Sequence, residues 1–233
     1  KRAFPKTNKY ELNNINKKIW ENYGRILSDY NFLKDFRSNK LGEFIHIDGE
    51  DILEKIKYNN KPVIFVSGHF NNFELLALIL EKSGINLAAL YRPLNNIFLN
   101  KIMLKLRKNY ICKNQVPKGI SGVKSLLNYF NKGLSIALMI DQRVSQGIKV
   151  KFFNVDAFTT TIPAQFFKKF NCQIVPVHIK RYDNYYFEIK IDKPFTFQKS
   201  INREDLTLIL NQWLEKKIIL NPEQWIWTHN RWK

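Results

Sequence analysis

Two mainly apolar runs without polar alternation constrain the fold of this chain more than any other feature. The first, Val63 to Val66, follows Lys61-Pro62, and the second, Leu134 to Ile140, ends at Asp141. A strand with one face in water would alternate apolar and polar residues, whereas these runs predict strands that are covered on both faces. Such strands are typical of parallel sheets with helices packed on each side, so the pattern predicts an α/β protein.

The rest of the chain alternates between helical and strand-like segments, without an internal repeat or a linker. Residues 8 to 37 repeat apolar side chains at helical spacing, while Tyr185 to Ile191 alternates as an antiparallel edge strand does. We therefore expect a single domain over residues 1–233, with a largely parallel mixed sheet flanked by helices. Further helices are expected over Glu50 to Tyr58, Asn72 to Leu80, Asn96 to Lys108, Ser121 to Asn131, Thr161 to Phe170 and Arg203 to Ile219, and further strands over Ile85 to Leu90 and Ile174 to Lys180.

The chain is strongly basic, since 38 Lys and Arg against 20 Asp and Glu give a net charge of +18. Either the surplus reflects the codon bias of an AT-rich genome, or it attracts nucleic acid, an anionic bilayer, an acidic protein or a phosphorylated lipid. No helix-turn-helix, zinc-finger or RNP pattern supports nucleic acid. The two cysteines, Cys112 and Cys172, exclude a disulfide-stapled scaffold and a cysteine-rich zinc site.

The most informative segment is GHFNNFE, Gly68 to Glu74, which follows the first buried run. Side chains at the carboxyl ends of parallel strands face the crevice where α/β folds bind ligands. His69 and Glu74 are five residues apart, so they meet only if His69 lies on the turn and Glu74 in the first turn of a helix. A histidine held by a carboxylate is the minimal general base for a hydroxyl. The alternative, which spacing alone does not exclude, is a structural histidine and a solvated Glu74.

This segment resembles the His-x4-Asp/Glu block of glycerolipid acyltransferases, and most of all that of the bacterial lipid A biosynthesis lauroyl/myristoyl acyltransferases. The resemblance covers nearly the whole chain, and five blocks in register favour a functional role for His69. The other four blocks are YRPLNN from Tyr91, with Arg107 after it, DQ at Asp141, FFNVDAFT from Phe152 and PEQWIWTHNRWK from Pro222.

The resemblance implies transfer of a fatty acyl group from an acyl-carrier-protein thioester to a hydroxyl of a lipid A precursor. In that reaction His69 would take the proton from the hydroxyl, and Glu74 would hold the imidazole. No metal ion and no cofactor besides the thioester donor is implied. The expected partners are acyl carrier protein, a phosphorylated glycolipid acceptor and an anionic membrane surface, and not nucleic acid.

Four further residues are expected to bind substrate. Arg92 and Arg107 are candidates for the phosphate of the acceptor, because a guanidinium fork suits phosphate oxygens. Asp141 is expected to orient other groups of the site, and backbone N–H groups near Asn72, or Arg92 itself, to stabilise the oxyanion. The alternatives are ion-paired or surface arginines and, for Asp141, a turn residue.

The chain departs from the family pattern at four positions. Asn71 and Asn154 stand where glycine is usual, Phe73 where tryptophan is usual and Asp156 where proline is usual. The His69 and Glu74 pair is intact, so these changes question the acceptor or chain-length preference more than the reaction.

Members of this family commonly begin with a membrane-anchoring helix, which the resemblance leads us to expect ahead of residue 1. The expected location is therefore the cytoplasmic face of the cell inner membrane. Two alternative functions remain open from the sequence. One is an acyltransferase acting on lysophosphatidate or another glycolipid, and the other is a basic nucleic-acid- or lipid-binding protein without catalysis.

Overall fold

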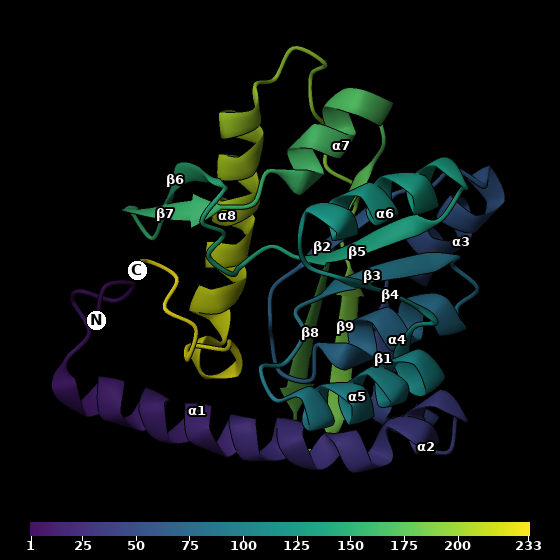
Figure 1. Ribbon diagram of the computed structural model, residues 1–233. Coiled ribbons are helices and arrows are strands. Elements are labelled where there is room, and N and C mark those ends of the chain that lie inside the picture. Colours follow the sequence, from purple (N-terminus) through teal and green to yellow (C-terminus); the bar gives the residue numbers. More distant parts are fainter.

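The computed structural model describes residues 1–233, and its centre is a seven-stranded sheet between helices (Figure 1). The strand order is β1-β9-β8-β2-β5-β3-β4, and every neighbouring pair is parallel except β8 and β9. This confirms the predicted α/β class with a largely parallel mixed sheet. Its strands are β1 (Ile45–Asp48), β2 (Ile64–Ser67), β3 (Leu87–Tyr91), β4 (Asn114–Pro117), β5 (Ser135–Met139), β8 (Ile174–Tyr182) and β9 (Tyr186–Ile191).

The helices cover both faces of the sheet because the chain crosses it in both directions. The connection from β2 to β3 passes over β5 one way, and the connection from β4 to β5 passes over β3 the other way. Right-handed crossovers then place the two connecting helices, α4 and α6, on opposite faces, as Figure 1 shows. The helices are α1 (Lys9–Asp29), α2 (Leu33–Arg37), α3 (Glu50–Asn59), α4 (Glu74–Lys82), α5 (Ile97–Leu106), α6 (Ile120–Asn131), α7 (Ile162–Phe170) and α8 (Arg203–Leu220).

A separate two-stranded hairpin, β6 (Ile148–Phe152) and β7 (Val155–Thr159), packs against α8 beside the two ends of the chain (Figure 1). Its turn places Phe153 and Asn154 at φ values of 51° and 60°. Asparagine tolerates this left-handed backbone better than most residues other than glycine, which explains why it can replace the usual glycine at position 154.

The core is densest along β2, whose four residues are all buried. Buried strands on either side of it, β5 and β8, continue one apolar layer across the sheet. The predicted runs are thus central strands, while β1, β4 and the hairpin were not predicted. No helix of the structure is both long enough and apolar enough to cross a membrane.

Candidate active site

His69 lies on the turn between β2 and α4, as the sequence predicts. The turn is tight because Asn71 adopts a φ of 39°, in the left-handed region that glycine favours and asparagine tolerates. Side-chain and backbone contacts fix this conformation, since Asn71 donates its backbone N–H to the carbonyl of Gln224 and its amide nitrogen to Asn22 Oδ1. The asparagine at position 71 therefore preserves the turn that glycine would allow.

Asp141, and not Glu74, is the carboxylate that holds His69. Asp141 Oδ1 lies 2.7 Å from His69 Nδ1, and its Oδ2 accepts the backbone N–H of His69, also at 2.7 Å. The buried indole of Trp225 donates a third hydrogen bond of 2.7 Å, to Oδ2. Burial opposes the charge of Asp141, but His69 and these hydrogen bonds outweigh it and hold the pKa of Asp141 below its ordinary value. Asp141 therefore remains an anion and an acceptor.

This geometry sets the tautomer of the imidazole. An ionised carboxylate only accepts, so the neutral ring of His69 carries its proton on Nδ1 and leaves the lone pair on Nε2. Nε2 lies 3.4 Å from the amide nitrogen of Gln142, and both side chains line the main cavity. His69 thus presents a basic nitrogen to that cavity, while the rings of His69 and Phe73 pack in an edge-to-face arrangement with 4.7 Å between centroids.

The expectation that Glu74 holds His69 is wrong in this structure, because no hydrogen bond or ion pair joins the two residues. Glu74 begins α4 and is buried, and its Oε1 accepts from Tyr30 Oη at 2.7 Å and Arg107 Nε at 2.8 Å. Burial, with Glu74 beside it, raises the pKa of Tyr30 far above its ordinary value. Burial opposes the charge of Arg107, but Glu74 raises its pKa overall. Glu74 therefore anchors Arg107 at the cavity wall.

Asn72 does not reach the cavity, contrary to expectation. It is buried, and its amide nitrogen donates to Asp29 Oδ2 at 3.0 Å. Arg181 pairs with the same Asp29 and donates from Nε to Asn71 Oδ1, so Asn72 belongs to a polar network behind the turn. The side chain of Asn72 also makes no capping hydrogen bond to α4, whose N-terminal boundary is Phe73.

The backbone of the turn offers no donor for an oxyanion, which corrects a second expectation. All five N–H groups from residue 69 to residue 73 already have acceptors within the protein. These acceptors are Asp141 Oδ2, the carbonyl oxygens of Gly68, Gln224 and Asn71, and Asn71 Oδ1. The N–H groups of residues 69 to 73 are therefore not free to stabilise a developing negative charge.

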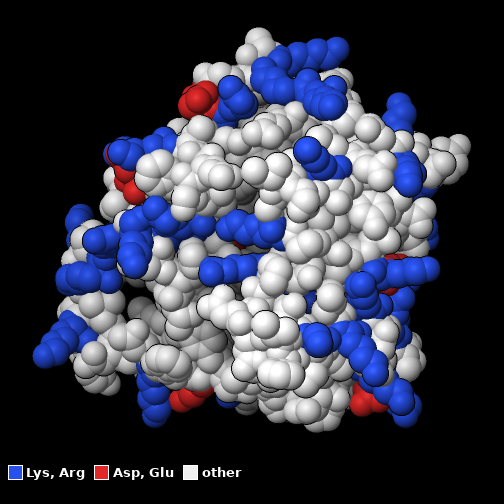
Figure 2. Space-filling view, in the orientation of Figure 1, with Lys and Arg blue, Asp and Glu red and all other residues white.

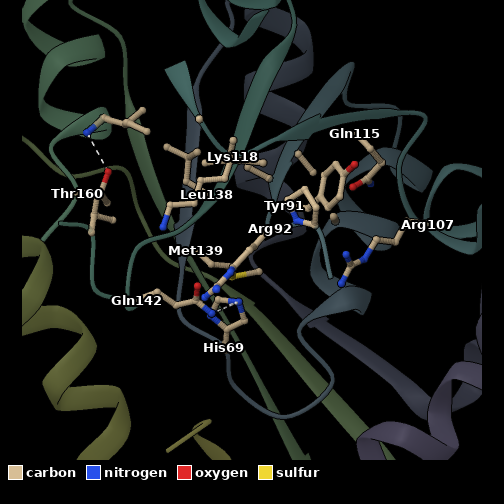
Figure 3. Close-up of a pocket in the computed structure, with 18 of the residues that line it drawn as sticks. His69, Tyr91, Arg92, Arg107, Gln115, Lys118, Leu138, Met139, Gln142 and Thr160 are labelled. Atoms are coloured by element: carbon tan, nitrogen blue, oxygen red, sulfur yellow. Dashed lines mark hydrogen bonds between the residues drawn. The ribbon is translucent and has the colours of Figure 1, made fainter. Parts of the chain in front are cut away.

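The main cavity has a volume of about 610 Å³ and opens beside His69 (Figure 3). Figure 3 shows Arg92, Lys118 and Gln142 on the His69 side, and Arg107 apart from it near Tyr91 and Gln115. The cavity wall is mainly apolar, with Ala77, Ala89, Leu90, Ile111, Val123, Ala137, Leu138, Met139, Val144 and Ile162 among its residues. A mainly apolar cavity with a basic nitrogen at one end suits a chain-like ligand that reacts at that end.

Of the two arginines expected to bind phosphate, Arg92 is exposed, whereas Arg107 is paired with Glu74. Arg92 follows β3, lines the cavity and forms no ion pair. Arg107 also lines the cavity, but two of its nitrogens bond Glu74. Phosphate binding by either residue stays a prediction, and a guanidinium that already neutralises a carboxylate is the weaker candidate.

The remaining nucleophilic and metal-binding groups lie outside the site. Cys112 and Cys172 are buried, and burial raises the pKa of each thiol to about 12, so neither forms a thiolate at neutral pH. His178 is buried against Phe70, with its ring centroid 4.7 Å away. No group of three or more His, Cys, Asp or Glu side chains is arranged to hold a metal ion.

Comparison with known proteins finds the family that the sequence blocks resemble. The family model for bacterial lipid A biosynthesis acyltransferases matches residues 1–233. The chain is also similar to the lipid A biosynthesis palmitoleoyltransferase of Escherichia coli (strain K12) and to a lipid A biosynthesis acyltransferase of Shigella flexneri. Each is 20% identical over 235 residues, which cover 99% of this chain and 75% of the relative. Because the family model matches the chain from end to end, the chain belongs to the bacterial lipid A biosynthesis acyltransferase family.

Proposed function

We propose that this protein transfers a fatty acyl group from an acyl-carrier-protein thioester to a hydroxyl of a phosphorylated lipid A precursor. One observation carries the proposal, namely a histidine that is held by a buried carboxylate and presents a basic nitrogen to an apolar cavity. Family membership supports the acyl transfer and the lipid A precursor. The acyl carrier protein as donor is an inference from the family resemblance and from the net charge of +18.

In the proposed reaction His69 acts as a general base and then as a general acid. Nε2 takes the proton of the acceptor hydroxyl as its oxygen attacks the thioester carbonyl, and a C–O bond forms. When the tetrahedral intermediate collapses, the C–S bond breaks and the imidazolium returns the proton to the leaving sulfur. Asp141 stabilises the imidazolium between these steps. A positioned base of this kind contributes about 10²–10⁴-fold in rate.

The oxyanion requires hydrogen-bond donors, and two side chains at the His69 end of the cavity can supply them. The Gln142 amide already lies 3.4 Å from His69 Nε2, a distance at which it holds the ring only weakly. An arriving hydroxyl would displace this amide, which could then donate to the thioester oxygen. Arg92 lines the same end and brings a positive charge. We therefore assign oxyanion stabilisation to Gln142 and Arg92.

No covalent acyl-enzyme is needed, because a thioester is already activated toward an alcohol. The two thiols of the chain are buried and protonated, which agrees with direct transfer. The acyl chain would lie along the apolar wall of the cavity. Glu74 contributes by fixing Arg107 in that wall.

Helix α5 supports a membrane-surface location on the cytoplasmic face of the inner membrane. None of its residues is buried, and Phe98 and Ile102 are 77% and 57% exposed although both are apolar. Lys101, Lys105 and Lys108 follow at helical spacing along the neighbouring side, and Figure 2 shows basic side chains beside an uncharged area where α5 lies. An apolar arc next to a basic arc is typical of helices that lie in the headgroup region of an anionic bilayer.

The proposal is tested by incubating the full-length protein, in membranes, with acyl-acyl carrier protein and one acceptor at a time. The acceptors are a phosphorylated lipid A precursor and lysophosphatidate, and mass spectrometry reports the product. We expect one added acyl group on the lipid A precursor, and little product with acyl-coenzyme A as donor. Acylation of lysophosphatidate alone, or of neither acceptor, would contradict the proposal.

A further inference from the structure

A second cleft adjoins the main cavity and is lined almost entirely by cationic and polar side chains. Its volume is about 580 Å³, and we call it the cationic cleft. Figure 2 shows basic side chains crowded on this side of the molecule, between the hairpin and α5. The residues of the cationic cleft that enter the argument are Arg92, Lys118, Arg143, Lys233, Ser145 and His229.

The lysines and arginines of the cationic cleft are not paired with carboxylates. No ion pair within 4.0 Å involves Arg92, Lys118, Arg143 or Lys233. Arg143 Nε is buried without any hydrogen-bond partner. Burial, together with the neighbouring Arg92, lowers the pKa of Lys118. Cations brought together in this way repel one another, so the cleft is stabilised when an anion enters it.

The fold builds this cluster from neighbouring strands. Arg143, Arg92 and Lys118 follow β5, β3 and β4, which are adjacent and parallel, so their carboxyl ends meet at one edge of the sheet. Ligands of α/β folds bind at such an edge. The cations therefore converge because of the sheet order, although they are up to 51 residues apart in the sequence (143 − 92).

The C-terminal segment closes the cationic cleft from the other side. His229 Nε2 accepts the backbone N–H of Arg143 at 2.9 Å, which fixes the loop that carries this arginine. The fully buried Arg231 anchors the segment by donating to the Phe158 carbonyl at 2.7 Å and to Thr159 Oγ1 at 2.6 Å. Arg143 Nη1 donates to Ser145 Oγ at 3.2 Å. These contacts fix Arg143 and the C-terminal segment at the edge of the cationic cleft.

We propose that the cationic cleft binds a phosphate monoester of the acceptor glycolipid while its hydroxyl lies at His69. Arg92 and Lys118 line both the cleft and the main cavity, so one ligand can occupy the two together. A phosphate monoester carries up to two negative charges and three acceptor oxygens, which matches several cations better than a single carboxylate or a phosphodiester does. This inference rests on the proposed function and deepens it by assigning Lys118, Arg143 and Lys233 to acceptor recognition.

The test compares Arg143→Gln and Lys118→Gln with Lys132→Gln, which removes one charge from an exposed lysine at the end of α6. Steady-state rates are measured in membranes with the phosphorylated acceptor and with the same acceptor after phosphatase treatment. We expect each cleft variant to raise the KM for the phosphorylated acceptor about tenfold, with kcat nearly unchanged, because each loses one charge-assisted hydrogen bond. The dephosphorylated acceptor and the Lys132→Gln variant should show no such change.

Two results would overturn the inference. One is a rise of the KM for the acyl-carrier-protein donor alone, which would assign the cleft to the phosphodiester of the donor. The other is an equal rise for both forms of the acceptor. Calorimetric titration of the acceptor in mixed micelles, without donor, measures binding independently of turnover. If both variants lose the phosphate-dependent part of the binding, the assignment of the phosphate to the cleft is supported even if no acyl transfer occurs. The two variants lie on different loops, so a folding defect in one does not decide the outcome.

Discussion

Replacing Asp141 by asparagine should prevent His69 from acting as a base, although the imidazole itself remains in place. Asp141 Oδ2 accepts two N–H groups, from the His69 backbone and from Trp225, while Oδ1 faces Nδ1 of the ring. An asparagine at this position has only one oxygen. An NH2 group at the Oδ2 position would face the N–H groups of the His69 backbone and of Trp225, which need an acceptor. The NH2 group should therefore occupy the Oδ1 position. Nδ1 must then accept, the ring proton moves to Nε2, and the lone pair is lost from the cavity.

The expected magnitude follows from this change of tautomer. With the ring proton of His69 on Nε2, the general base is lost, and kcat should fall by about 10²–10⁴-fold with little change in KM. The assay is acyl transfer under single-turnover conditions, with circular dichroism to verify folding. Asp51→Asn, on the exposed face of α3 where Asp51 pairs with Lys55, is the matched control and should keep wild-type rates. Glu74→Gln retains an acceptor for Arg107 and should keep activity within about tenfold. Near-normal rates for Asp141→Asn, together with loss in Glu74→Gln, would refute the reasoning.

Two other predictions concern α5 and His178. Replacing Phe98 and Ile102 together by serine should weaken sedimentation with phosphatidylglycerol vesicles at least tenfold without changing the melting temperature, because two exposed apolar side chains no longer enter the bilayer; unchanged partition would exclude α5 as the contact. Burial lowers the pKa of His178 to about 3, so only the unfolded chain takes its proton as the pH falls below about 6.5, and stability decreases. In urea unfolding, the free energy lost between pH 7 and pH 5.5 should be about 1 kcal/mol smaller in His178→Gln than in the wild type; equal losses would contradict the assignment.

The sequence was sufficient for the central strands because their apolar runs are local signals. Val63 to Val66 covers β2 except for Ser67, Leu134 to Ile140 contains the whole of β5, and the turn after the first run contains His69. The hairpin was missed although its first strand alternates Ile148, Val150 and Phe152 with lysines, a pattern that predicts a strand. The edge strands β1 and β4 are four residues each, too short for a reliable pattern.

The spacing of residues near His69 in the sequence could not predict which carboxylate holds its ring. Glu74 is near His69 in the chain, but it lies at the start of α4, where it faces Tyr30 and Arg107. Asp141 is 72 residues from His69, and it meets the ring because β5 is the direct neighbour of β2. Strand order depends on long-range packing, which no single motif encodes. The same reason hid the cationic cleft, whose residues follow three different strands.

The central claim is that His69 removes the proton of the acceptor hydroxyl, and the single-turnover rate of His69→Gln tests it most directly. Glutamine cannot act as a base but fills a similar volume and can still donate an amide hydrogen to Asp141. We expect acyl transfer to the lipid A precursor to fall by at least about 10²-fold at saturating donor and acceptor, with the fold intact. A rate within a few-fold of the wild type would show that another group takes the proton and would contradict the account.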